Sequence, residues 1–317
     1  MNPIHVGGQA VIEGVMMRAP KALAIVVRRR SGQLVSKEDE WRSLSERWTF
    51  LKWPIVRGPI ILIESLINGI QALNFSANQA LEDEGEAEKP MNRWVLSATF
   101  FVALALGLGL FVVLPHILAA WALSLTTFKH GVDSLWFHAA DGFIKILFFW
   151  AYIRLISLHG EIKRIFQYHG AEHKAIHTYE HGEALTTENA RKYSTVHPRC
   201  GTSFILLVLL ISMIFFATMF AFMPGLPDMN PLGRNALFIL YKIAFMLPIA
   251  GFAYELIRWS AKKKRTSVPA RLLMAPGMWL QNLTTHEPSD RQVEVALEAL
   301  TRVIEIESRN KPHDIIL

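Results

Sequence analysis

The sequence predicts a mainly α-helical, polytopic membrane protein of about four spans with a cytoplasmic α+β portion. Two stretches, residues 94–114 and 203–223, each run for 21 residues without a charged side chain. A helix of that length crosses a hydrocarbon core of about 30 Å. Hydrophobic residues make up 51% of the chain and its mean hydropathy is +0.25, which favours membrane insertion over two soluble domains.

Two further spans are predicted from less regular stretches. Residues 235–254 are apolar except for one lysine near the start and one proline, and residues 142–158 are shorter and include two basic side chains. Long basic side chains can extend to the interface, and neighbouring helices can satisfy the backbone beside an internal proline. The spans therefore pair as residues 94–158 and 203–257.

The N-terminal region, residues 1–53, is expected to be a small strand-containing unit. Residues 22–28 are apolar and β-branched, Ser31 and Gly32 offer a turn, and residues 33–36 can return as an antiparallel strand. The earlier glycines are interpreted as turns of this unit.

Residues 54–81 are rich in isoleucine but carry a stripe of polar side chains. This pattern favours an amphipathic helix that lies in the membrane interface or packs on the bundle, with a fifth crossing as the alternative. The acidic stretch at residues 82–93 is interpreted as a solvated linker into the first span.

The distribution of basic residues predicts the topology. Lysine and arginine number twelve before residue 94, six within residues 160–202 and ten from residue 258 onward, whereas the two remaining connections hold one each. The positive-inside bias therefore places both termini and the middle segment, residues 159–202, in the cytoplasm of a bacterial cytoplasmic membrane. The single cysteine, Cys200, suits a reducing compartment.

The C-terminal region, residues 258–317, is expected to combine a basic juxtamembrane segment with a cytoplasmic helix. Ser289 or Asp290 can cap this helix, whose apolar residues recur at helical spacing and predict docking on the cytoplasmic portion. The basic cluster is expected to contact anionic lipid, and nucleic-acid binding is disfavoured. The cluster consists of Lys262, Lys263, Lys264 and Arg265.

The middle segment carries the candidate metal ligands and the candidate catalytic base. Its histidines recur every four residues, so a helix places the imidazoles along one face, where neighbours can share a divalent ion, zinc being favoured. His169, Glu172 and His173 also fit the H-x-x-E-H pattern, in which the glutamate acts as the base toward bound water. The candidates are His169, His173, His177 and His181, with Glu172 and Glu180 between them.

His197 and Cys200 follow downstream and offer an imidazole and a thiolate. If both bind together with His169 and His173, the metal site is closed and structural. If three protein groups bind and water takes the fourth position, the site is catalytic. The alternatives are a hydrogen-bonded polar core or a solvated face, with His181 capping helix carbonyls and Cys200 packing as a small apolar residue.

Two other groups of residues are candidate sites. Glu13 and Arg18 lie in a glycine-rich string that matches no phosphate loop or dinucleotide fingerprint, and Arg18 could bind an anionic substrate or pair with Glu13. His116, His130 and His138 are expected in the outer connection, where they do not form the opposed pair that a haem between spans requires.

Four segments together resemble the YqhQ-like family of bacterial membrane proteins, over nearly the whole chain. They read GGQAVIEGVMMRAP, ALNFSANQA, YHGAEHKAIHTYE followed by HPRCGTSF, and PGMWLQNLTTHEPSDRQVEVA. The resemblance implies a multi-span membrane protein that is labelled a predicted metal-dependent enzyme without a settled reaction. It assigns no catalytic residue to this chain.

The leading hypothesis from the sequence is a membrane-anchored, zinc-type metalloprotein, with a hydrolase at the inner membrane face as the candidate activity. The second is a scaffold or accessory protein that binds a protein partner and uses its histidines for a structural metal or a polar core. The third is a transporter, for which the two uninterrupted spans offer no ionisable residue but Lys145, Arg154 and Lys242 remain available.

Overall fold

The structure, a computed structural model, describes residues 4–83, 93–125, 134–198, 200–221, 230–262 and 267–309. The chain forms two compact units. The sheet unit combines Met1–Glu88, Ile156–Ser203 and Met278–Leu317, and the helical unit combines Lys89–Leu155 and Phe204–Gly277.

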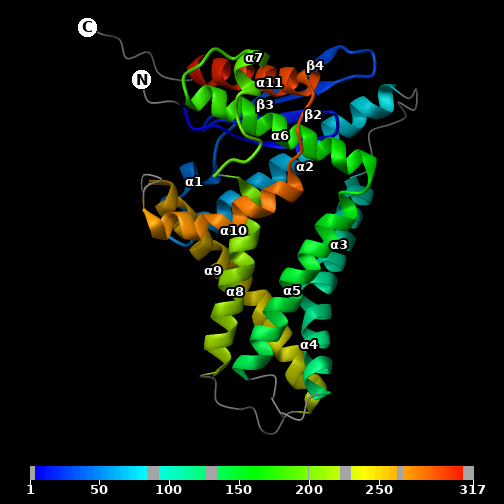
Figure 1. Cartoon of the computed structure of the whole chain (residues 1–317), viewed down its shortest axis with the longest axis vertical. Coiled ribbons are helices and arrows are strands. Elements are labelled where there is room, and N and C mark those ends of the chain that lie inside the picture. The colour runs from blue at the N-terminus through cyan, green and yellow to red at the C-terminus, as the bar shows by residue number, and fades with distance from the viewer. Residues whose placement is uncertain are drawn as a thin grey trace. The chain divides into compact units, whose positions relative to one another are not determined.

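The sheet unit is built on four antiparallel strands in chain order (Figure 1). They are β1 (Gly7–Val11), β2 (Gly14–Arg18), β3 (Ala22–Arg28) and β4 (Leu34–Glu40). The predicted hairpin is confirmed as β3 and β4, with Val27 opposite Val35 and Gly32 at a φ of 89° in the turn. The sequence does not predict β1 and β2, because their glycines are typical of turns. A Cβ on Gly14 would lie 2.4 Å from the carbonyl oxygen of Val26, so close strand packing requires that glycine.

Helices cover both faces of the sheet. Alternate residues of β3 point to opposite faces, and both sets are buried. One face packs against α6 (Gly160–Glu180) and α11 (Asp290–Arg309), and the other contributes Leu23, Ile25 and Val27 to a cluster with Ala72 of α2 (Arg57–Asp83). The strands are therefore apolar on both sides, which explains the continuous run that predicted β3.

The predicted C-terminal docking helix is confirmed as α11. Ser289 precedes its first residue, and the backbone N–H and hydroxyl of Ser289 both donate to Oε1 of Gln292, three positions later. The bond from the Ser289 N–H to the side chain at N3 is one half of a capping box. The apolar face of α11, including Val293, Ala296 and Leu300, is buried against α6 and the sheet.

Helix α2 has one face on the sheet and one exposed apolar face. Its contacts with the sheet extend from Glu64, which pairs with Arg18 at 2.9 Å, to Gln79, which accepts from Arg29. The other face exposes large apolar side chains, namely Leu62, Ile63, Leu66, Ile67, Ile70 and Leu73. The helix is long and apolar enough to cross a membrane, and it also contacts the sheet along most of its length.

Glu64 connects α2 to the chain that enters it. Its carboxylate accepts from Ser43 Oγ at 2.8 Å and from the Leu44 N–H at 2.7 Å, at the start of α1 (Leu44–Arg47), and it also receives the Arg18 ion pair. A short 3-10 turn, η1 (Thr49–Lys52), follows α1. Arg18 additionally stacks over the Trp41 ring, 4.8 Å from its centroid.

We expect Glu64→Ala to destabilise the sheet unit by about 2–3 kcal/mol, because it leaves the partly buried Arg18 without its counterion and removes two acceptor contacts. Chemical denaturation of the full-length protein in detergent, followed by tryptophan fluorescence, measures this effect. Glu46→Ala, in exposed α1, is the matched control and should change the unfolding free energy by less than about 0.5 kcal/mol. Equal effects of the two substitutions would contradict the assigned role of Glu64.

The helical unit contains the apolar helices. They are α3 (Arg93–Leu108), a π turn η2 (Gly109–Val113), α4 (Leu114–Ser124), α5 (Leu135–Ile156), most of α8 (Gly201–Ala221), α9 (Pro231–Lys262) and the first part of α10 (Val268–Thr284). Among the described residues, three helical stretches are long and apolar enough to cross a membrane: Arg57–Glu82, Ala98–Ser124 and Leu232–Ser260. Ser203–Met219 is a shorter apolar helix, and the predicted span at 142–158 lies within α5.

Two predicted boundaries differ from the structure. The first span does not end at Leu114, because the π turn precedes Pro115 and the proline occupies the first turn of α4, where its missing N–H is tolerated. Helix α5 begins at Leu135, before the predicted start of the second span. His116 and His138, expected in the outer connection, are therefore buried in helices.

Several predictions concern residues that the structure does not describe. His130, residues 84–92 of the acidic linker and Lys263, Lys264 and Arg265 of the basic cluster lie outside the described residues, and Lys262 is the last residue of α9.

Candidate metal centre

Helix α6 holds His173 and His177 in a buried position, whereas His169 is half-buried and His181, just after the helix, is exposed. Every residue from Gly170 to Thr178 is buried. Ala171 and Ala175 belong to the core that α6 shares with the sheet and α11. His173 and His177 both contact the chain at residues 195–196. The four-residue spacing therefore places imidazoles on a helix face that is shielded from solvent.

The structure brings His169 and His173 together with Cys200. One donor atom from each lies within 4.8 Å of the others, and His169 Nε2 is 3.2 Å from Cys200 Sγ. Groups at the corners of a tetrahedral zinc site lie about 3.5 Å apart, given bond lengths of about 2.0–2.3 Å. The spacing of this group, called here the His–His–Cys group, is suitable for one ion.

Backbone carbonyls determine which ring nitrogen carries the proton. His169 Nδ1 lies 2.9 Å from the Thr284 carbonyl oxygen, and His173 Nδ1 lies 2.5 Å from that of Thr195. Because a carbonyl can only accept, both Nδ1 atoms donate, and in the neutral rings both Nε2 atoms are acceptors. Burial lowers the pKa of His173, which keeps this ring neutral. The second ring nitrogen of metal-binding histidines is held in the same way.

His197 belongs to a different group of donors. Its Nε2 lies 3.5 Å from Glu180 Oε2, and donor atoms of His177, Glu180 and His197 lie within 4.8 Å of one another. His177 Nε2 contacts the Val196 carbonyl oxygen at 3.0 Å. The His197 ring thus lies beside a carboxylate, and its centroid is also 5.7 Å from that of the His173 ring, so the two donor groups are neighbours.

Glu172 is buried against the first strand. The N–H of Gly8 donates to its carboxylate, and burial raises the pKa of Glu172. A Cβ on Gly8 would lie 2.9 Å from Glu172 Cγ and Cδ, so the strand must carry glycine there. Glu172 belongs to neither donor group among the described residues, but it is adjacent to His173 in the chain.

Two residues that the sequence analysis missed hold the loop that carries His197 and Thr195. Gln281 accepts from the His197 N–H at 2.7 Å and donates to the His197 carbonyl and to Ser203 Oγ, each at 2.8 Å. Lys174 is buried, donates to the Tyr193 carbonyl at 2.8 Å and pairs with Glu287. A glutamine and a lysine have no motif that marks such a role in a sequence.

The other predicted site residues have structural partners. Glu13, in the turn between β1 and β2 with a φ of 51°, pairs with Arg164 and accepts from the Tyr168 hydroxyl at 3.2 Å. Arg18 pairs with Glu64, so the suggested Glu13–Arg18 pair does not form; the two residues lie at opposite ends of β2. His181 Nδ1 contacts the His177 carbonyl at 2.7 Å, which is the capping role considered for it.

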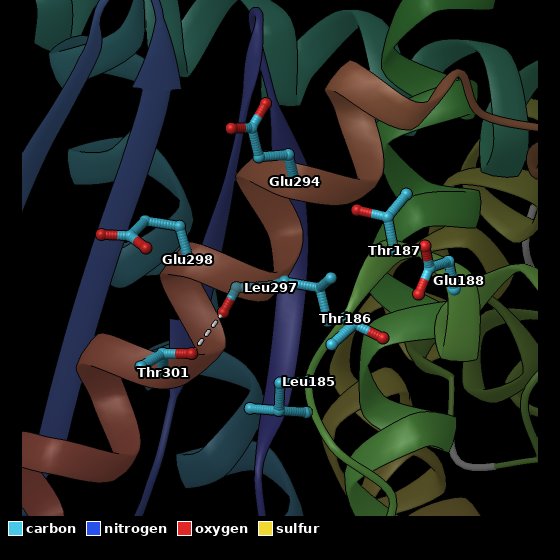
Figure 2. A pocket seen from close by; sticks show the side chains of 8 residues that line it. All are labelled: Leu185, Thr186, Thr187, Glu188, Glu294, Leu297, Glu298 and Thr301. Carbon is cyan, nitrogen blue, oxygen red and sulfur yellow. Dashed lines mark hydrogen bonds between the residues drawn. The ribbon is translucent and has the colours of Figure 1, made fainter.

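A separate cavity of about 400 Å³ lies beside α7 (Thr187–Arg191) and α11 (Figure 2). Its walls carry carboxylates and hydroxyls, and the Thr301 hydroxyl donates to the Leu297 carbonyl within its own helix. The cavity shares no residue with either donor group. It is lined by Leu185, Thr186, Thr187, Glu188, Glu294, Leu297, Glu298 and Thr301.

Comparisons with known proteins give a family and no reaction. Residues 53–306 match the family described as "Protein of unknown function (DUF1385)". The chain is 31% identical over 320 residues to "Uncharacterized protein YqhQ" of Bacillus subtilis (strain 168), which covers 96% of this chain and 94% of that protein. The resemblance predicted from the four sequence segments is confirmed. No solved structure matches the chain.

Proposed function

The chain belongs to the DUF1385 family, and from the geometry of its histidine segment we propose that it is a membrane-anchored metalloprotein with an open, three-ligand zinc-type centre. The ligands are His169, His173 and Cys200. The reaction class that this centre best serves is hydrolysis, because three protein ligands leave a coordination position for water or substrate.

One observation carries the metal assignment. His169 and His173 each donate from Nδ1 to a backbone carbonyl, so in the neutral rings both Nε2 atoms are acceptors beside the single thiol of Cys200. One S–H can donate to one nitrogen, whereas a cation bound to the thiolate and to both Nε2 atoms would satisfy all three groups. A soft thiolate and two imidazoles favour zinc among divalent ions.

A bound divalent metal would supply Lewis-acid activation of a water molecule. The protein residues supply orientation and proton transfer. Thr284 and Thr195 hold the two imidazole rings through their carbonyls, and His173, which is 1% exposed, is shielded from bulk water. Glu172 is the candidate proton acceptor, as its position in the H-x-x-E-H pattern implies.

The membrane arrangement that fits this proposal has the sheet unit in the bacterial cytoplasm. Spans in α3–α4, α5, α8 and α9 would keep both termini on one side, in agreement with the basic residues around the sheet unit. Helix α2 would lie in the interface with its exposed apolar face in lipid, and the basic cluster after α9 would face anionic headgroups.

Metal analysis and cobalt spectroscopy of the full-length protein in detergent test the proposal. We expect a stoichiometric transition metal in the wild type, and its loss in His169→Ala and Cys200→Ser. His159→Ala, which removes an exposed histidine just before α6, is the matched control and should keep the metal. In the cobalt form, azide should shift the visible bands, because a three-ligand site accepts an added anion.

Other outcomes would favour different functions. Stoichiometric metal with bands that azide does not change indicates four protein ligands and a structural site, as in a scaffold or accessory protein. Absence of metal from correctly folded wild-type protein would disprove the metal centre and leave a polar histidine core. Glu172→Gln should keep the metal, and its loss there would show that Glu172 shapes the site.

A further inference from the structure

A hydrogen-bonded group of buried polar side chains joins three helices of the helical unit and shares no residue with the metal centre. Asp141 Oδ2 accepts from Lys145 Nζ at 2.8 Å on the same helix, α5, and from Lys242 Nζ of α9 at 2.6 Å. Lys242 Nζ also lies 3.0 Å from His116 Nδ1 of α4, and His116 Nε2 lies 3.4 Å from Asn235 Oδ1. Three helices therefore contribute to one connected group, called here the lysine–aspartate cluster.

The cluster is buried among apolar side chains. Asp141 is 3% exposed, Lys145 8% and Lys242 1%. Phe137 and Phe238 belong to the surrounding apolar core, and Lys242 lies over the Phe137 ring at 5.4 Å from its centroid. His116 and Lys242 lie within the two stretches of this unit that are long and apolar enough to cross a membrane.

The charges of the cluster do not balance when both lysines are protonated. Two ammonium groups share one oxygen of one carboxylate, which sums to +1. Among the described residues, Asp141 Oδ1 is buried without a hydrogen-bond partner. The other titratable groups that face the cluster are His116 on α4 and His138 on α5. An uncompensated charge in an apolar interior is costly, and ionisable groups inside membrane helices are typical of ion and proton pathways.

We propose that the lysine–aspartate cluster is a proton-binding site that exchanges one proton, with Lys242 as the exchanging group. Lys242 lies between the carboxylate and an imidazole, so it contacts two other groups that can accept a proton. Release converts the Lys242 ammonium to an amine, the proton leaves to water, and the formal charge of the cluster falls from +1 to zero. Uptake reverses both changes, so the helical unit alternates between two charge states.

Potentiometric difference titration of the folded, full-length protein in detergent tests the site. We expect wild type to exchange one proton more than Lys242→Met between about pH 6 and 10. Lys163→Met, which removes an exposed lysine outside the cluster, is the control for the loss of one lysine. Identical wild-type and Lys242→Met titrations over that interval would overturn the proposal.

Thermal unfolding in the same detergent gives an independent readout. Lys242→Met leaves one lysine paired with Asp141, so its unfolding midpoint should equal or exceed that of wild type at neutral pH. Lys145→Met should behave in the same way, whereas Asp141→Asn removes the only carboxylate identified in the cluster and should lower the midpoint. If chloride raises the wild-type midpoint and Lys242→Met abolishes that effect, a bound anion neutralises the cluster and the proton site is wrong.

Discussion

Gly170→Ala is expected to destabilise the sheet unit by about 2–3 kcal/mol and to weaken metal binding. A Cβ at this position would lie 2.2 Å from the His286 carbonyl oxygen and 3.1 Å from Thr195 Cγ2. The His286 N–H donates to the Phe166 carbonyl, so this backbone is held against α6 and cannot retreat freely. Chemical denaturation of the full-length protein in detergent measures the stability change.

The same substitution should lower metal affinity roughly 10–100-fold, the range typical of lost outer-shell support. It displaces the two chain segments whose carbonyls, at Thr284 and Thr195, orient His169 and His173. Competition with a chelator measures the affinity. Gly160→Ala is the matched control, since it lies at the start of the same helix with nothing within 4 Å of the added Cβ. A similar loss in both variants would mean that helix propensity, and not the close approach, determines the effect.

The parts of the fold that the sequence predicts are those with a local signal. The hairpin of β3 and β4 follows from a β-branched run and Gly32, and α11 follows from Ser289 and a regular apolar face. The four-residue spacing of histidines likewise predicts their common helix face, which the structure contains.

The parts that were missed depend on contacts between distant segments. In the sequence the glycines of β1 and β2 look like turn residues. In the structure Glu172 lies against Gly8 and Val26 lies against Gly14, so both positions require glycine. The contact between His197 and Glu180 joins residues that are 17 positions apart. No spacing rule indicates that His197 lies beside this carboxylate.

Local sequence patterns also do not predict the ion pairs inside the helical unit. Lys145 and Lys242 each look like a tolerated interruption of a span, and their separation of 97 positions in the sequence gives no sign of their shared partner. A span predicted to begin at residue 142 leaves Asp141 just outside it. Helix α5 starts earlier, at Leu135, so Asp141 lies within a helix and at the centre of the lysine–aspartate cluster.

Lys174→Met is expected to destabilise the sheet unit by about 2–3 kcal/mol, because it removes the donor that satisfies the Tyr193 carbonyl at 2.8 Å and the Arg191 carbonyl at 3.3 Å. These carbonyls belong to the chain that leads to Thr195, so the acceptor for His173 Nδ1 should become mobile and metal affinity should fall about tenfold or more. Denaturation and chelator competition measure the two effects. Lys192→Met is the matched control: this neighbouring lysine is exposed, and its loss should change stability by less than about 0.5 kcal/mol. If Lys174→Met loses stability but keeps full metal affinity, the loop does not orient His173, and the imidazole is held by α6 and the metal alone.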